Sequence, residues 1–155
     1  MTRRVLLDTN LLIAAFDKSG RTSVEMKTSA ITMLTQLLAD DNVALFITPL
    51  IRYEVLRGVS WLNKAEFDEL QATLNGFPEL DITRDISELS ANLFRFDNWQ
   101  AAQPGAAARN LEKRKFDVFH FSSAHCNTLE LCSNDSDIGR IRQLHQSYDV
   151  AASNH

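Results

Sequence analysis

Short apolar runs alternate with longer segments of helical period along this chain. The runs lie at 5–7, 44–47, 79–82 and 129–132, and they are rich in the aliphatic residues that are typical of strands. Between the first two runs, Ile31, Leu34 and Leu38 share one side of a helix that we expect over 24–38. This alternation of strands and helices predicts an α/β fold with a central, mainly parallel sheet.

Two further helices are expected from local signals. Thr48 before Pro49 is typical of a helix cap followed by proline at the first helical position. A second helix should begin near Arg84, and its core-facing stripe comprises Ile86, Leu89, Leu93 and Phe96. The segment 100–109 breaks the helical period at Pro104 and Gly105, which predicts a loop that leads into the functional site.

Size and composition indicate one domain. A chain of 155 residues with 45% hydrophobic residues can bury one sizeable core. We expect a single domain over 1–148 and a frayed polar tail over 149–155. No apolar run approaches the roughly 20 residues that span a bilayer, and Arg3-Arg4 lead directly into a strand, so we expect a cytoplasmic protein without a membrane partner. Cys126 and Cys132 match neither a disulfide framework nor zinc spacing, which predicts free, partly buried thiols.

Four acidic residues lie where apolar segments end or helices begin. Asp8 directly follows the first strand, and Asp135 shortly follows the last. Glu54 should point inward from its helix, and Asp117 should open a helix over 117–125 at the positive end of its dipole. Alone, each residue is also compatible with a cap or a turn. Together they predict a site for a hard divalent cation, because clustered carboxylates near apolar strands need a neutralising charge.

Polar neighbours accompany two of these acids. Thr9 and Asn10 follow Asp8, and Ser133 and Asn134 precede Asp135. We expect them to orient the carboxylates or metal-bound waters, although ordinary cap and turn chemistry is an equal alternative.

A local basic segment precedes Asp117. The net charge of −4 argues against binding nucleic acid by bulk charge, but a local patch remains possible. Such a patch would engage RNA phosphates, and the alternative is a solvated helix face. Its candidate residues are Arg109, Lys113, Arg114 and Lys115.

In this order the motifs resemble those of the PIN-domain ribonucleases and, among them, the VapC-like toxins of toxin–antitoxin pairs. The resemblance spans nearly the whole chain and is carried by L-D-T-N-L-L-I at 7–13, Y-E-V-L-R-G at 53–58, F-D-V at 116–118 and S-N-D-S-D-I at 133–138. Ser133 and Ile138 depart mildly from the threonine and phenylalanine that are commoner in the family's last motif. The resemblance implies a three-layer α/β/α fold.

The resemblance also implies a ligand set and partners. It assigns Mg²⁺ or Mn²⁺ to Asp8, Glu54, Asp117 and Asp135, with Asp137 as an accessory ligand. It further implies an RNA substrate, a homodimer, and a small antitoxin that blocks the carboxylate pocket. The apolar segments 61–62 and 94–96 are candidates for contact surface, although core packing is the commoner place for such residues.

The expected activity is metal-dependent hydrolysis of RNA by a toxin that inhibits translation. A bound metal would activate a water, and the carboxylates would hold the metal rather than attack. The rival from another class is a catalytically silent PIN-like module that binds RNA or protein, and a third candidate is a DNA nuclease. An EF-hand is excluded, because the twelfth position counted from Asp135 is Gln146 instead of glutamate.

Overall fold

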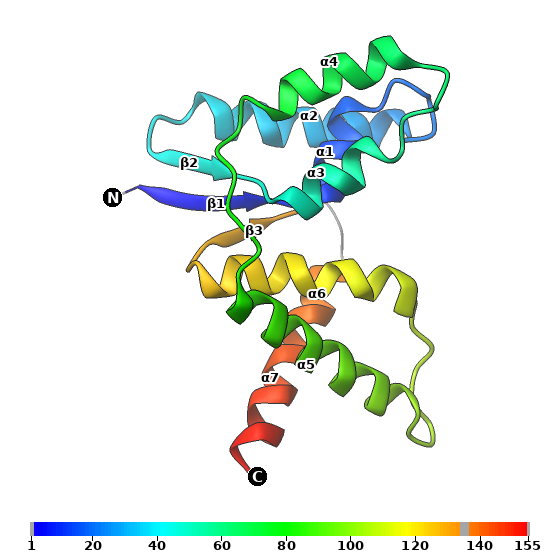
Figure 1. The fold of residues 1–155 in the computed structure, drawn as a ribbon, viewed down its shortest axis with the longest axis vertical. Coiled ribbons are helices and arrows are strands. Elements are labelled where there is room, and N and C mark those ends of the chain that lie inside the picture. The colour runs from blue at the N-terminus through cyan, green and yellow to red at the C-terminus, as the bar shows by residue number, and fades with distance from the viewer. Residues whose placement is uncertain (1, 134–136, 155) are drawn as a thin grey trace. The chain divides into compact units, whose positions relative to one another are not determined.

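The computed structural model describes residues 2–133 and 137–154 (Figure 1). Their contacts group into two compact units. The first comprises residues 1–81 with 128–135, and the second comprises 82–127 with 136–155.

The first unit contains a three-stranded parallel sheet. Its strands are β1 (Arg3–Leu7), β2 (Val43–Phe46) and β3 (Glu130–Cys132), in the order β2-β1-β3. Leu6 lies opposite Phe46 on one side and Leu131 on the other. Val5, Leu6 and Leu7 are all buried, which is typical of a central parallel strand. Three of the four predicted strands, and their parallel pairing, are therefore confirmed.

The predicted strand over 79–82 is wrong. Only an isolated parallel bridge joins Ile47 to Glu79, with Ile47 N–H donating to Pro78 O at 3.0 Å and Leu80 N–H donating to Ile47 O at 2.9 Å. The pairing stops there because Thr83 already caps the next helix.

Four helices of the first unit begin at recognisable caps or strand ends. They are α1 (Thr9–Phe16), α2 (Val24–Ala39), α3 (Pro49–Leu56) and α4 (Lys64–Leu74). The Thr48 hydroxyl accepts from Ile51 N–H at 3.2 Å with Pro49 at the first position, so the predicted start of α3 is confirmed.

The predicted buried face of α2 is only partly right. Leu34 is buried, but Ile31 and Leu38 are exposed, and Ala30 takes the inward position one turn before Leu34. Helices α1 and α2 pack against each other. A small side chain such as Ala30 permits a close approach between helices, which apolarity alone did not indicate.

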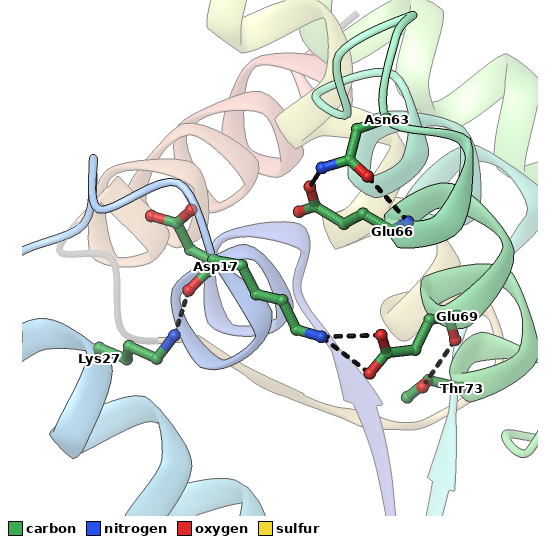
Figure 2. Close-up of polar contacts among 7 residues, drawn as sticks. Asp17, Lys27, Asn63, Glu66, Glu69 and Thr73 are labelled. Atoms are coloured by element: carbon green, nitrogen blue, oxygen red, sulfur yellow. Dashed lines mark hydrogen bonds and ion pairs between the residues drawn. The ribbon is translucent and has the colours of Figure 1, made fainter.

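Polar contacts join α1, α2 and α4 at the end of α1. Figure 2 shows Lys27 of α2 donating to the backbone oxygen of Asp17, and Lys18 Nζ lies 2.8 Å from a carboxylate oxygen of Glu69 on α4. The Asp17 carboxylate accepts hydrogen bonds from the Ser19 hydroxyl, from Ser19 N–H and from Thr22 N–H. These bonds hold its pKa well below the usual range.

The second unit consists of α5 (Arg84–Ala101), α6 (Leu111–Cys126) and α7 (Asp137–Ser153). Leu93, Val118 and Leu144 form its core, with Leu89 and Phe96 packed against them. The predicted α5 stripe is therefore confirmed. The loop between α5 and α6 is also confirmed, and Gly105 adopts a φ of 78° within it.

Two predicted boundaries in this unit are wrong. Helix α6 begins at Leu111, where Asn110 caps it by accepting from Lys113 N–H, so Asp117 does not open the helix. Helix α7 continues to Ser153, so residues 149–153 are helical instead of a frayed tail. Among the helices of the described residues, none is both long and apolar enough to cross a membrane.

Candidate active site

Asp8 lies at the carboxyl end of the central strand. Its N–H donates to Cys132 O at 2.9 Å, which continues the parallel ladder one residue beyond β1. Asp8 occupies the N-cap position of α1, yet its side chain makes no capping hydrogen bond, and the residue is only 5% exposed. The alternative that Asp8 is an ordinary helix cap is therefore not supported.

Ser133 holds the Asp8 carboxylate. The register that pairs Leu7 with Cys132 brings the next residue of each strand side by side, and Ser133 Oγ donates to Asp8 Oδ2 at 2.7 Å. A hydroxyl bonded to a buried carboxylate fixes its rotamer without neutralising its charge.

A second polar contact connects α1 to α3. Thr9 is buried, and its hydroxyl donates to Glu54 Oε1 at 3.1 Å. Glu54 is half-buried on α3, and Asn10 is half-buried on the first turn of α1. The start of α1 thus carries one predicted acid, Asp8, and hydrogen-bonds a second, Glu54.

The remaining predicted ligands are separate from this group or lie outside the description. Asp117 is half-buried within α6 and belongs to the second unit. Asn134 and Asp135 lie outside the described residues, and Asp137 is described only as the first backbone position of α7. The convergence of the four acids therefore stays a prediction.

The oxygen donors of the first unit fit a hard divalent cation. Asp8 and Glu54 offer carboxylates, and Thr9 and Ser133 contribute hydroxyls, which are the ligand types that Mg²⁺ and Mn²⁺ prefer. No basic side chain within 2–133 or 138–154 pairs with Asp8. Within the same residues, no group of three or more histidine, cysteine, aspartate or glutamate side chains is placed so that it could hold a metal ion. The buried Asp8 charge is compatible with neutralisation by a bound cation, which would need further ligands.

The basic residues before Asp117 have different environments. Arg114 is buried, and its Nε lies 3.1 Å from Asp97 Oδ2, so a solvated helix face is the wrong description of this residue. Arg109 pairs with the other oxygen of the same carboxylate. Lys115 is exposed and pairs with Glu112 at 2.8 Å, and Lys113 is half-buried.

Asp97 was missed by sequence reasoning. It is buried on α5, four residues after the core residue Leu93. An acidic residue on a buried helical stripe needs a cationic partner, and that position was the available signal.

The two cysteines are free thiols, as predicted, but only Cys132 is partly buried. Cys126 is exposed, yet partial desolvation by its neighbours raises the pKa of its thiol. Cys132 is half-buried at the end of β3, and desolvation raises its pKa as well. Neither thiol therefore has the lowered pKa of a reactive nucleophile.

Comparisons with solved structures show the same fold in three bacterial proteins. VapBC2 from Rickettsia felis, solved bound to a DNA fragment from its promoter, is 19% identical, with a TM-score of 0.61 over 88% of this chain and 92% of that one. A toxin–antitoxin complex from Klebsiella pneumoniae is 23% identical, with a TM-score of 0.55 over 85% of this chain and 87% of that one. VapC20 from Mycobacterium tuberculosis, described as a toxin that cleaves the sarcin–ricin loop, is 10% identical, with a TM-score of 0.58 over 88% of this chain and 93% of that one.

Sequence comparison identifies the family. No curated protein matches the chain, but the PIN domain family model matches residues 5–144. The match spans β1 to α7 and confirms the predicted α/β/α fold class. The chain therefore belongs to the PIN-domain family.

Proposed function

We propose that this protein is a metal-dependent endoribonuclease that serves as the toxin of a toxin–antitoxin pair. The observation that carries the proposal is Asp8, a buried acid at the end of the central strand. Its side chain is held by Ser133 and makes no capping hydrogen bond to α1. Two solved structures of this fold are described as a toxin and as a toxin–antitoxin complex, which supports the biological role.

The proposed ligand set comprises the acidic residues of the sequence motifs. Asp8, Asp117 and Asp135 would hold Mg²⁺ or Mn²⁺ directly or through water, and Asp137 would be an accessory ligand. Such a metal supplies charge neutralisation at the phosphoryl oxygens and an activated water. Glu54, whose Oε1 accepts a hydrogen bond from the Thr9 hydroxyl, would position a water molecule and accept its proton.

The polar neighbours would support this set. Ser133 restricts the Asp8 carboxylate to one orientation, and Thr9 does the same for Glu54. Asn10 and Asn134 would hydrogen-bond metal-bound waters or RNA oxygens. Preorganised ligands of this kind reduce the rearrangement needed when metal and substrate bind.

The partners follow from the same proposal. The substrate would be cytoplasmic RNA whose cleavage stops translation, and a small antitoxin would cover the acidic residues. We also propose that the protein forms a homodimer. Trp61 and Leu62 are almost fully exposed on the segment between α3 and α4, so they offer apolar contact surface for one of these partners.

Purified protein incubated with RNA and Mg²⁺ or Mn²⁺ tests the proposal. We expect cleavage that EDTA abolishes, and a loss of at least about 100-fold in Asp8→Asn and Asp117→Asn variants that remain folded. Asp41→Asn is the matched control, because it makes the same isosteric change at an exposed loop position. DNA of the same sequence serves as a second substrate.

Four results would contradict the endoribonuclease proposal. Cleavage that persists in EDTA would exclude the metal, and full activity in Asp8→Asn would exclude the carboxylate. RNA binding without cleavage at any metal concentration would instead identify a catalytically silent PIN module. Preferential cleavage of DNA would reassign the substrate.

A further inference from the structure

A cavity of about 390 Å³ lies within the second unit, between the end of α5, the loop that precedes α6, and α7. Its charged lining consists of Asp97, Arg109, Arg114 and Arg140. Three arginines against one aspartate give a net charge of +2, although the whole chain carries −4. The cavity is therefore a local basic site on an acidic protein.

Buried charges build one wall of this cavity. The Asp97 side chain is 2% exposed and the Arg114 side chain is 9% exposed, so both are held by surrounding structure. Arg109, whose side chain is 20% exposed, pairs with the same carboxylate from the loop. Two guanidinium groups thus share one carboxylate, which leaves one positive charge without an acidic counterpart in this trio.

The wall contains one buried acceptor and one buried donor that make no hydrogen bond with the described residues. The acceptor is Asp97 Oδ2, which lies 3.1 Å from Arg114 Nε as an ion pair. Arg114 Nη1 is buried, and no residue that the structure describes accepts a hydrogen bond from it. Gln100, Gln143 and Ser147 also line the cavity, and their amide and hydroxyl groups can donate hydrogen bonds to an anion. A preformed group of arginine and amide donors matches an anion with several acceptor oxygens, such as a phosphate.

We propose that this cavity binds a backbone phosphate of the RNA substrate, an assignment that rests on the proposed function. Arg114 precedes Asp117 by three residues on α6, and side chains at this spacing are neighbours with Cβ atoms about 5–6 Å apart. One wall of the cavity therefore stands about one helical turn from an acid that we propose as a metal ligand. The arginines offset the repulsion between those acids and the polyanionic strand.

Binding of a short single-stranded RNA, followed by fluorescence anisotropy in EDTA, tests the proposal without cleavage. Arg140→Gln should weaken binding about tenfold, the equivalent of one charge-assisted hydrogen bond. It should also reduce the slope of log affinity against log salt by about 0.7, the value for one phosphate contact on a single strand. Arg140→Lys should recover part of the affinity, because it keeps the charge but loses the planar fork.

Arg142→Gln is the matched control. Arg142 is exposed on the same helix, α7, and does not line the cavity, so its loss should change affinity less than twofold. Arg109→Gln should behave like Arg140→Gln. Equal effects of Arg140→Gln and Arg142→Gln would overturn the proposal, because they would indicate only a general charge effect.

Two further outcomes separate this proposal from the nuclease proposal. RNA binding that depends on Arg140, in a protein that never cleaves RNA, would reject the nuclease and retain the cavity. RNA cleavage together with unchanged affinity in Arg140→Gln would reject the cavity and retain the nuclease. Inorganic phosphate, added as a competitor of the RNA, tests whether the cavity binds a phosphate group. If phosphate displaces RNA equally well from wild type and from Arg140→Gln, the assignment would also be overturned.

Discussion

Replacing Asp97 with leucine should destabilise the fold by about 3–5 kcal/mol. The change removes the carboxylate between Arg109 and Arg114, and Arg114 would remain buried without a counter-charge. Removing one partner of a buried ion pair costs about this much, because the other charge stays desolvated. The loss is a large part of the 5–15 kcal/mol that is typical of a domain.

The same contacts predict a smaller cost for Arg114→Met. In that variant Asp97 keeps Arg109, so the buried carboxylate is still neutralised. We expect a loss of about 2 kcal/mol, within the range for one hydrogen bond to a charged group. In the double variant both buried charges disappear, and apolar pairs of similar volume are often as stable as the ion pair that they replace. Its stability should lie within about 1 kcal/mol of wild type.

Urea unfolding followed by far-ultraviolet circular dichroism measures the free energy of unfolding of the wild type and of the three variants. The order of stability should be wild type, close to the double variant, then Arg114→Met, and then Asp97→Leu. If Asp97→Leu alone is too unstable to fold, recovery of a cooperative transition in the double variant still tests the reasoning. Additive losses in the double variant would refute it, because they would show that the two side chains act independently.

Three further changes test other local features. Ser133→Ala removes the hydroxyl that donates to Asp8 Oδ2, and it should raise the Mn²⁺ concentration for half-maximal RNA cleavage about 10- to 100-fold. An unchanged Mn²⁺ concentration would show that this hydroxyl is not needed for metal binding. Asp17→Asn should lower Tm at pH 7 and lower it less at pH 3. The hydrogen bonds from Ser19 and Thr22 lower the pKa of the Asp17 carboxyl in the folded state, so the stability that they give is lost as pH falls below about 4. An equal loss of Tm at both pH values would contradict this linkage. Thr128 has a φ of 56°, a conformation that is strained for a β-branched residue but that asparagine adopts more readily. Thr128→Asn should therefore raise Tm by about 2–4 °C in thermal unfolding. A lower Tm would show that the substitution does not relieve backbone strain.

The strand positions could be predicted because apolarity and chain direction are local signals. The runs that form β1, β2 and β3 are rich in aliphatic residues. Two parallel strands must be joined by a long crossover connection, usually a helix, so the helical segments between these runs indicated parallel pairing. The run at 79–82 carries a similar signal, but the helix cap at Thr83 ends it after one bridge. A strand needs both a suitable sequence and enough chain before the next element.

The start of α6 depended on long-range contacts instead. The sequence around Asn110 is polar and lacks a regular apolar stripe, so it looked like loop. In the structure Arg114 lies in the first turns of α6 and pairs with Asp97 on α5. That contact buries a charged side chain for which the sequence suggested either an RNA-binding patch or a solvated helix face. Sequence periodicity indicates which apolar side chains are buried, but it does not indicate which charged side chains form buried ion pairs.

Asp8 and Asp97 show how buried acids can be distinguished. Both are acidic residues at positions that are otherwise apolar, and both are at most 5% exposed. Asp97 is neutralised by two arginines of its own unit, so its burial needs no ligand. Asp8 receives a hydroxyl from Ser133, but no basic side chain of the described residues reaches it. A hydroxyl orients a carboxylate without balancing its charge, and an unbalanced buried anion is costly. The difference between the two sites is therefore the physical reason to expect an external cation at Asp8 and none at Asp97.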